Sequence, residues 1–67
     1  MERLHIRELR EAAGITQEAL AMDLGVSRVA VVQWESGKKN PQASKLPKMA
    51  DSLNCTIDQL FGREAAS

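Results

Sequence analysis

Three glycines divide the first part of this sequence into short segments. Gly14 and Gly25 each follow a segment whose apolar side chains recur with helical spacing, and Gly37 closes the run that follows Ser27. Glycine is favoured just beyond a helix because it adopts the left-handed backbone conformation without steric cost. Thr16 and Ser27 precede the second and third segments, where either residue makes a good N-cap. The chain is therefore predicted to fold into short helices joined by tight turns.

Helical periods and caps place four of the expected helices. The first runs from about Arg3 to Ala13, and the second begins after Thr16. Another follows Ser44 as its cap, and the last opens at the capping box Thr56–Gln59. The stripe of the first helix is Ile6, Leu9, Arg10 and Ala13, and the inward residues of the second are Leu20, Ala21 and Leu24. The same spacing recurs at Leu46, Met49, Ala50 and Leu53, and the last helix carries Ile57, Leu60 and Phe61.

The segment Arg28–Trp34 could also be a strand, because its three valines and one tryptophan are residues that sheets favour. A single strand among helices would have no partner for its backbone amides and carbonyls. Ser27 supplies a cap before the segment, and Gly37 supplies a stop after it. We therefore predict a helix over Arg28–Ser36, which makes the whole domain all-α.

A chain of 67 residues has room for one hydrophobic core, so residues 1–67 are expected to form a single domain, with 63–67 fraying. One cysteine excludes an intramolecular disulfide, and the lone His5 and Cys55 do not supply the ligands of a usual metal site. Nothing resembles a signal peptide, and no apolar run approaches the roughly 20 residues of a membrane span. A cytoplasmic protein with no metal, cofactor or membrane partner is expected.

No arrangement of residues typical of an enzyme occurs in the sequence. There is no combination of Ser, His and Asp, no cysteine near His5 and no glycine-rich phosphate loop. A chain this short also has little room for a substrate pocket. His5 is interpreted as a surface residue and Cys55 as a small buried one. We expect neither catalysis nor a small-molecule ligand.

The charges are balanced in total but segregated along the chain. Nine Lys and Arg residues match nine Asp and Glu residues. Residues 26–50, however, carry five basic residues and only one acid, a net charge of +4, while each flanking segment carries −2. A domain with no net charge can therefore present a basic face.

The third helix has two unlike faces when its residues are placed at about 100° intervals. The face expected to pack on the core holds Ser27, Ala30, Val31 and Trp34. The opposite face holds Arg28, Val29, Val32, Gln33 and Ser36. The major groove of B-DNA admits a helix and offers acceptors to Arg, a donor–acceptor pair to Gln and thymine methyls to apolar side chains. The alternative is that the valines pack on another subunit or lie in water.

The second and third helices together form a compact unit, at about residues 16–36. The turn Leu24–Val26 is short and contains glycine, and Ala21 is the small residue that close packing of the two helices requires. Such a turn lets the second helix of the unit enter a groove while the first crosses the phosphates.

A set of motifs with specific joint spacing runs from about Ile6 to Phe61. The motifs are Ile6-Arg7-x-Leu9-Arg10, Gly14-Ile15-Thr16-Gln17-x-x-Leu20-Ala21, Leu24-Gly25-Val26-Ser27, Trp34-Glu35-x-Gly37-Lys38, Pro41 and Leu46-x-x-x-Ala50-x-x-Leu53. With these motifs the chain resembles the helix-turn-helix family of phage repressors and Cro proteins, the XRE family. The resemblance implies a compact five-helix, lambda-repressor-like domain that binds a palindromic double-stranded DNA operator as a homodimer and represses, or sometimes activates, transcription. Such a bacterial or phage-type protein would act in the cytoplasm, in association with the nucleoid.

The same resemblance assigns roles to individual residues. The expected base-reading residues are Arg28, Val29 and Gln33, with Ser27 and Val32 beside them. The expected phosphate-binding residues are Thr16 and Gln17, together with Lys38, Lys39 and Asn40, which would act through side chains and amides. The candidates for a dimer contact are Ile57, Leu60 and Phe61, although each could equally complete the core of the monomer.

Arg10 and Glu35 are expected to form a structural ion pair. Arg10 lies within the apolar stripe of the first helix and Glu35 flanks the inward face of the third, so each would be a costly buried charge alone. The resemblance implies that they pair and fix the angle between the two helices.

The competing interpretation of the whole chain is a protein-interaction module, such as an antitoxin or an adaptor, that uses the Val29 and Val32 face.

Overall fold

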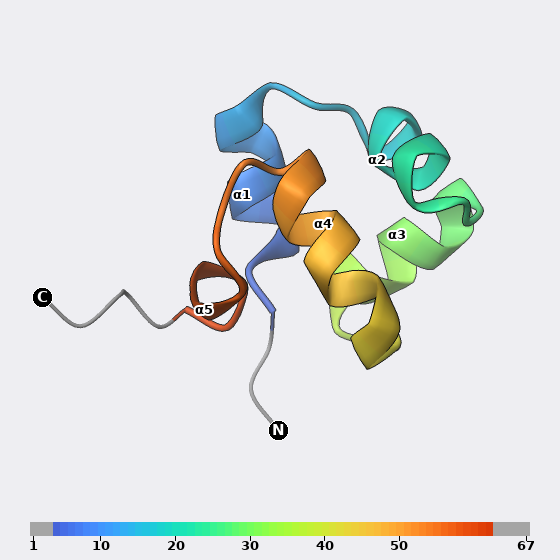
Figure 1. The fold of residues 1–67 in the computed structure, drawn as a ribbon. Coiled ribbons are helices and arrows are strands. Elements are labelled where there is room, and N and C mark those ends of the chain that lie inside the picture. Colours follow the sequence, from blue (N-terminus) through green and yellow to red (C-terminus); the bar gives the residue numbers. More distant parts are fainter. Residues whose placement is uncertain (1–3, 63–67) are drawn as a thin grey trace, which may run out of the picture.

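The computed structural model describes residues 4–62, which form five α-helices and one 3-10 turn without any strand (Figure 1). The all-α prediction is confirmed, and the third segment is a helix. The elements are α1 (Ile6–Ala13), α2 (Gln17–Leu24), α3 (Arg28–Ser36), η1 (Ala43–Lys45), α4 (Leu46–Ser52) and α5 (Ile57–Leu60). The expected fraying of residues 63–67 lies outside the described residues.

The predicted caps define both ends of the helices that matter most for the site. The Thr16 Oγ1 accepts a hydrogen bond from the Ala19 amide at 3.0 Å, and the Ser27 Oγ accepts one from the Ala30 amide at 3.2 Å. Gly25 ends α2 with φ at +69°, a conformation in which a side chain would be strained. The capping box at the start of α5 is complete. Local sequence signals therefore set these boundaries correctly.

The start of the first helix was predicted too early. Of the expected range, Arg3 lies outside the described residues, and Leu4 and His5 precede the helix, which begins at Ile6. The His5 amide donates to the Leu60 carbonyl at 2.8 Å, which ties this segment to α5. This contact joins residues 55 positions apart, so no local pattern indicates it. Ala13, the last residue of the predicted stripe, is exposed.

Ser44 is not the cap of the fourth helix. It lies within η1, and the residue before α4 is Lys45, which makes no capping bond through its side chain. The chain thus enters α4 through a 3-10 turn that already directs it into helical geometry. Pro47 occupies the first turn of α4, where its missing amide would have had no helical partner.

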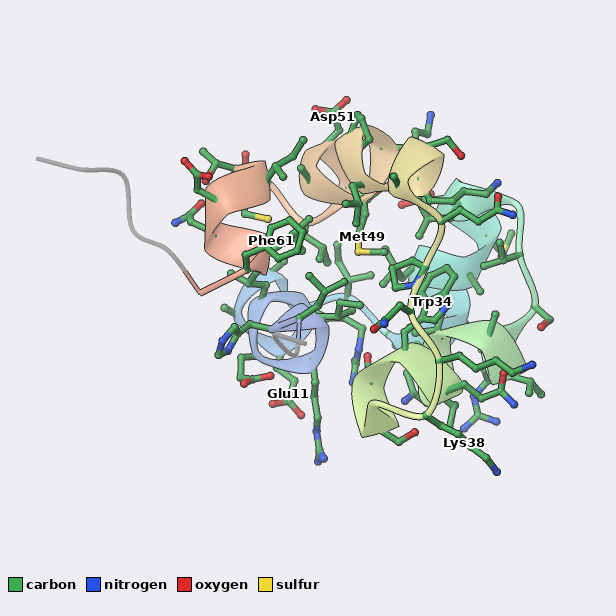
Figure 2. The ribbon with its side chains drawn as sticks, turned by 90° about the horizontal axis from the view of Figure 1, so that it is seen from below. Glu11, Trp34, Lys38, Met49, Asp51 and Phe61 are labelled. Carbon is green, nitrogen blue, oxygen red and sulfur yellow. The ribbon has the colours of Figure 1, made fainter. Side chains whose placement is uncertain are left out.

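The core lies between α4 and the other helices. Figure 1 shows α4 across the middle of the molecule, and α4 packs against α2 and α5 while α1 packs against α3. In Figure 2, Met49 points from α4 into the interior, toward the side where Trp34 lies. The buried apolar residues are Leu4, Ile6, Leu20, Ala21, Leu24, Val31, Trp34, Met49, Ala50, Leu53 and Leu60. No helix within residues 4–62 has the length and apolar character needed to cross a membrane.

Candidate nucleic-acid interface

The turn between α2 and α3 is held by backbone and side-chain bonds. The Val26 amide donates to the Ala21 carbonyl at 3.0 Å, and Ala21 itself is only 3% exposed. From a distant part of the chain, Lys45 donates its Nζ to the Leu24 carbonyl at 3.2 Å. Lys45 thereby satisfies a carbonyl at the C-terminal end of α2, where cations are favoured. The orientation of α3 relative to α2 is therefore well determined.

One side of α3 is anchored and the other is open. Val31 is fully buried and Trp34 is 8% exposed, so the inward face predicted for this helix largely holds. Val29 is 63% exposed and Val32 is 39% exposed. Ser27 was also expected to face inward, but it is exposed because its hydroxyl caps the helix instead. The helix therefore presents two valines to solvent.

The polar side chains of this face differ in exposure and in their hydrogen-bond partners. Among the described residues, the exposed Arg28 side chain has no hydrogen-bond or ion-pair partner. Gln33 is half-buried. Ser36 is exposed and donates its hydroxyl to the Gln33 carbonyl at 3.1 Å. Arg28 is thus the cation of α3 that is available to a ligand.

The loop after α3 carries two exposed lysines. The amides of Lys38 and Lys39 both donate to the Gln33 carbonyl, at 3.0 and 3.2 Å. These two amides were expected to bind phosphate, but they are used to terminate the helix. The side chains of Lys38 and Lys39 have no partner within the described residues, and Figure 2 shows Lys38 projecting from the end of α3. Asn40 is exposed in the same loop.

The expected ion pair between Arg10 and Glu35 is present and connects α1 to α3. The Arg10 Nε donates to Glu35 Oε2 at 2.6 Å, and a second guanidinium nitrogen donates to Oε1 at 3.3 Å. The third guanidinium nitrogen donates to the Ile15 carbonyl at 2.8 Å. Side-chain exposure is 12% for Arg10 and 6% for Glu35. The hydrogen bond to Glu35 and its charge raise the pKa of Arg10 despite the opposing effect of burial.

Gln17 belongs to the same network, which the sequence did not indicate. Its Nε2 donates to Glu35 Oε1 at 3.0 Å, and its side chain is half-buried at the first position of α2. Thr16, next to it, uses its hydroxyl oxygen to cap α2. Three helices therefore meet at one carboxylate. No spacing rule would have found this contact, because it joins residues 18 positions apart on different helices.

The three candidates for a dimer contact have different environments. Leu60 is fully buried in the core of the monomer and is therefore not available to a partner, which corrects the prediction for this residue. Ile57 is 41% exposed, and Phe61 is partly buried against the core. Figure 2 shows Phe61 at α5, on a different side of the molecule from Lys38.

An open pocket of about 470 Å³ lies between the end of α1 and the segment that joins α4 to α5. Leu9, Ala12, Leu53 and Cys55 are among the residues that line it. Burial raises the pKa of the Cys55 thiol, which is only half-buried rather than buried as expected. Within the part of the chain that the structure describes, no three His, Cys, Asp or Glu side chains are grouped so that they could hold a metal ion.

Residues 6–60 match the family model described as Helix-turn-helix. The chain belongs to this family. It is 44% identical over 59 residues to an HTH-type transcriptional regulator of Archaeoglobus fulgidus, and the match covers 88% of this chain and 84% of that protein. It is 41% identical over 59 residues to the HTH-type transcriptional activator BcrR of Enterococcus faecalis, and the match covers 88% of this chain. The chain spans only 29% of the length of BcrR.

Among solved structures, the chain is similar to the P22 c2 repressor in complex with a synthetic operator. The TM-score is 0.79 with 36% identity, and the match covers 88% of this chain and 89% of that one. The five-helix, repressor-like fold inferred from the resemblance is thereby confirmed. The relatives named here are regulators of transcription rather than enzymes.

Proposed function

We propose that this protein is a sequence-specific regulator of transcription, and in the first instance a repressor, that binds operator DNA with α3 in the major groove. The observation that carries this function is the open face of α3, with Val29 63% exposed and Arg28 unpaired among the described residues. Solvent-facing helix surfaces normally hold charged residues, so two exposed valines beside a free cation suit a groove better than water. A protein bound over a promoter represses by excluding polymerase from the same DNA.

The chemistry of each base-reading residue predicts its target. Arg28 suits the two acceptors of guanine, and Gln33 suits the donor–acceptor pair of adenine. Val29 suits a thymine methyl, because it is the most exposed apolar side chain of α3. Ser27 and Val32 lie beside these residues at the start and middle of the helix. Arg28→Ala should therefore relax specificity at one position, by about 1–3 kcal/mol.

Contacts with the phosphates would position α3 without reading sequence. Lys38 and Lys39 supply free ammonium groups beside the end of α3. Thr16 and Gln17 lie at the N-terminal end of α2, whose dipole favours an anion. Asn40 adds an exposed amide in the loop. We call these five residues the rim, and we expect it to contact phosphates beside the exposed face of α3.

A homodimer on a palindromic operator is part of the proposal. Two-fold pairing would place two α3 helices about 34 Å apart, on one face of the duplex. With Leu60 in the core, Ile57 and Phe61 remain as contact residues, since they are the apolar side chains of this region with exposed surface. Analytical ultracentrifugation with and without operator tests this directly, and a monomer in both conditions would contradict it.

The absence of catalysis and a cytoplasmic, nucleoid-associated location also belong to the proposal. The exposed face of α3 consists of side chains suited to base edges, and we expect none of them to act as a nucleophile or a general base. A regulator that reads operator DNA must reach the nucleoid, which lies in the cytoplasm of a bacterial cell.

Selection from a pool of random duplexes is the experiment that tests the function. We expect an enriched palindrome, and we expect Arg28→Ala and Gln33→Ala to lose or change it. The second candidate is a protein-interaction module, favoured by the exposed Val29 and Val32. It predicts no enriched sequence and no effect of either substitution on residual DNA binding.

A further inference from the structure

The amide of Gln17 is held by a buried carboxylate. Its Nε2 donates to Glu35 Oε1 at 3.0 Å, while Glu35 is only 6% exposed and is paired with Arg10. Gln17 nevertheless keeps part of its surface in solvent, at the first position of α2. This residue therefore lies at the boundary between the interior ion pair and the rim proposed to face DNA.

A carboxamide carries two N–H donors on one nitrogen. Glu35 takes one of them, which restricts the rotation of the side chain and leaves the second donor unassigned. A phosphate oxygen accepts only, so it can bind Gln17 through this same nitrogen. A Gln17 amide already held in place loses less conformational freedom on binding than a free one.

We propose that Glu35 is a positioning residue for DNA binding, because it holds the Gln17 amide so that the second N–H donates to a backbone phosphate. The inference rests on the proposed function, in which α2 crosses the phosphates. It gives the Arg10–Glu35 pair a second role, besides fixing the angle between α1 and α3, because Glu35 also binds the Gln17 amide.

Arg10 is necessary to this arrangement for an electrostatic reason. A lone carboxylate close to a DNA phosphate would repel it in a region of low dielectric. Arg10 donates to both oxygens of Glu35, at 2.6 and 3.3 Å, which balances the charge while Oε1 still accepts from Gln17. The amide then links a neutralised carboxylate to the phosphate without placing two uncompensated anions together.

The test is a mutant cycle on DNA affinity, measured by fluorescence anisotropy with the selected operator. Arg10→Met with Glu35→Leu removes both charges at once, a replacement that often preserves stability. In the parent, Gln17→Ala should weaken binding about fivefold, the value of one hydrogen bond. In the Met/Leu background, the same substitution should cost less than twofold. Lys39→Ala is the matched control and should cost the same factor in both backgrounds.

Equal losses from Gln17→Ala in the two backgrounds would overturn the positioning role, and so would the absence of any loss in the parent. Failure of the proposed function would look different, since the parent itself would select no operator.

A second measurement uses only the parent and therefore does not depend on how the Met/Leu variant folds. In NMR spectra, nuclear Overhauser contacts between the Gln17 amide protons and the Glu35 side chain should persist in the operator complex. Their disappearance on DNA binding would show that Gln17 leaves Glu35 to reach the phosphate, which contradicts the proposal.

Discussion

Val29, the more exposed valine of α3, allows the loss of DNA affinity to be predicted for an operator that lacks one thymine methyl. Val29 is 63% exposed, so most of its surface is available to a base edge. A thymine methyl removed from water against it contributes about 0.8 kcal/mol, the value of one buried carbon. Replacing that thymine by uracil deletes only the methyl and keeps the base pair. Affinity should fall about fourfold for one half-site, and by about 15-fold when both halves of a palindrome are changed.

Fluorescence anisotropy with a set of duplexes, each with one thymine replaced by uracil, measures this effect at every position of the operator. The matched control is Val29→Ala, which removes the apolar partner and should abolish most of the sensitivity at the contacted position. Sensitivity at other thymines should remain unchanged in the variant. If no uracil substitution weakens binding of the parent, or if Val29→Ala leaves the sensitivity intact, the methyl contact is wrong.

Three further predictions concern the ion pair, the loop and the cysteine. Arg10→Ala leaves Glu35, which is 6% exposed, without its cation and should cost about 3–5 kcal/mol of unfolding free energy in urea titration. Lys39→Ala should weaken binding to all DNA sequences alike and reduce the magnitude of the salt slope, log K against log salt, by about 1 per subunit. Burial raises the pKa of the Cys55 thiol, so iodoacetamide should alkylate the folded protein more slowly than the urea-unfolded protein at equal pH. Equal alkylation rates in both states would contradict the assignment. The fold also disfavours the thiolate, so this group should leave the stability unchanged below the ordinary thiol pKa and should lower it as the pH rises above that value.

Helix ends were predictable where their cause is local. The hydroxyls of Thr16 and Ser27 bond to amides only three residues away, and Gly25 adopts the left-handed conformation that the apolar pattern required at that point. Such interactions depend on the identity of a few neighbouring residues, so the sequence contains nearly all the information needed. The inward position of Val31 and Trp34 follows in the same way from helical spacing.

Local patterns did not indicate contacts with residues distant in the sequence. The His5 amide, just before α1, donates to the Leu60 carbonyl, which is 55 positions away. Leu60 is buried by the packing of the whole domain, although its spacing on a short helix also suited a dimer contact. Lys45 counted as one of the five cations of the basic segment, but it binds the Leu24 carbonyl. Each of these partners is fixed by the tertiary fold, which single-residue patterns do not describe.

Zero net charge is compatible with DNA binding in this fold because exposed cations gather at α3 and in the loop that follows it. The free cations Arg28, Lys38 and Lys39 are on α3 and the loop that follows it, whereas Asp51 is on α4. Figure 2 shows Asp51 and Lys38 at opposite ends of the molecule, whose extents are 35 × 25 × 20 Å. At physiological ionic strength, exposed charges are screened beyond about 8 Å. A phosphate beside Lys38 is therefore attracted by the cations near it and is hardly repelled by Asp51. We therefore expect the local charge at α3, rather than the total of the chain, to determine the affinity for DNA.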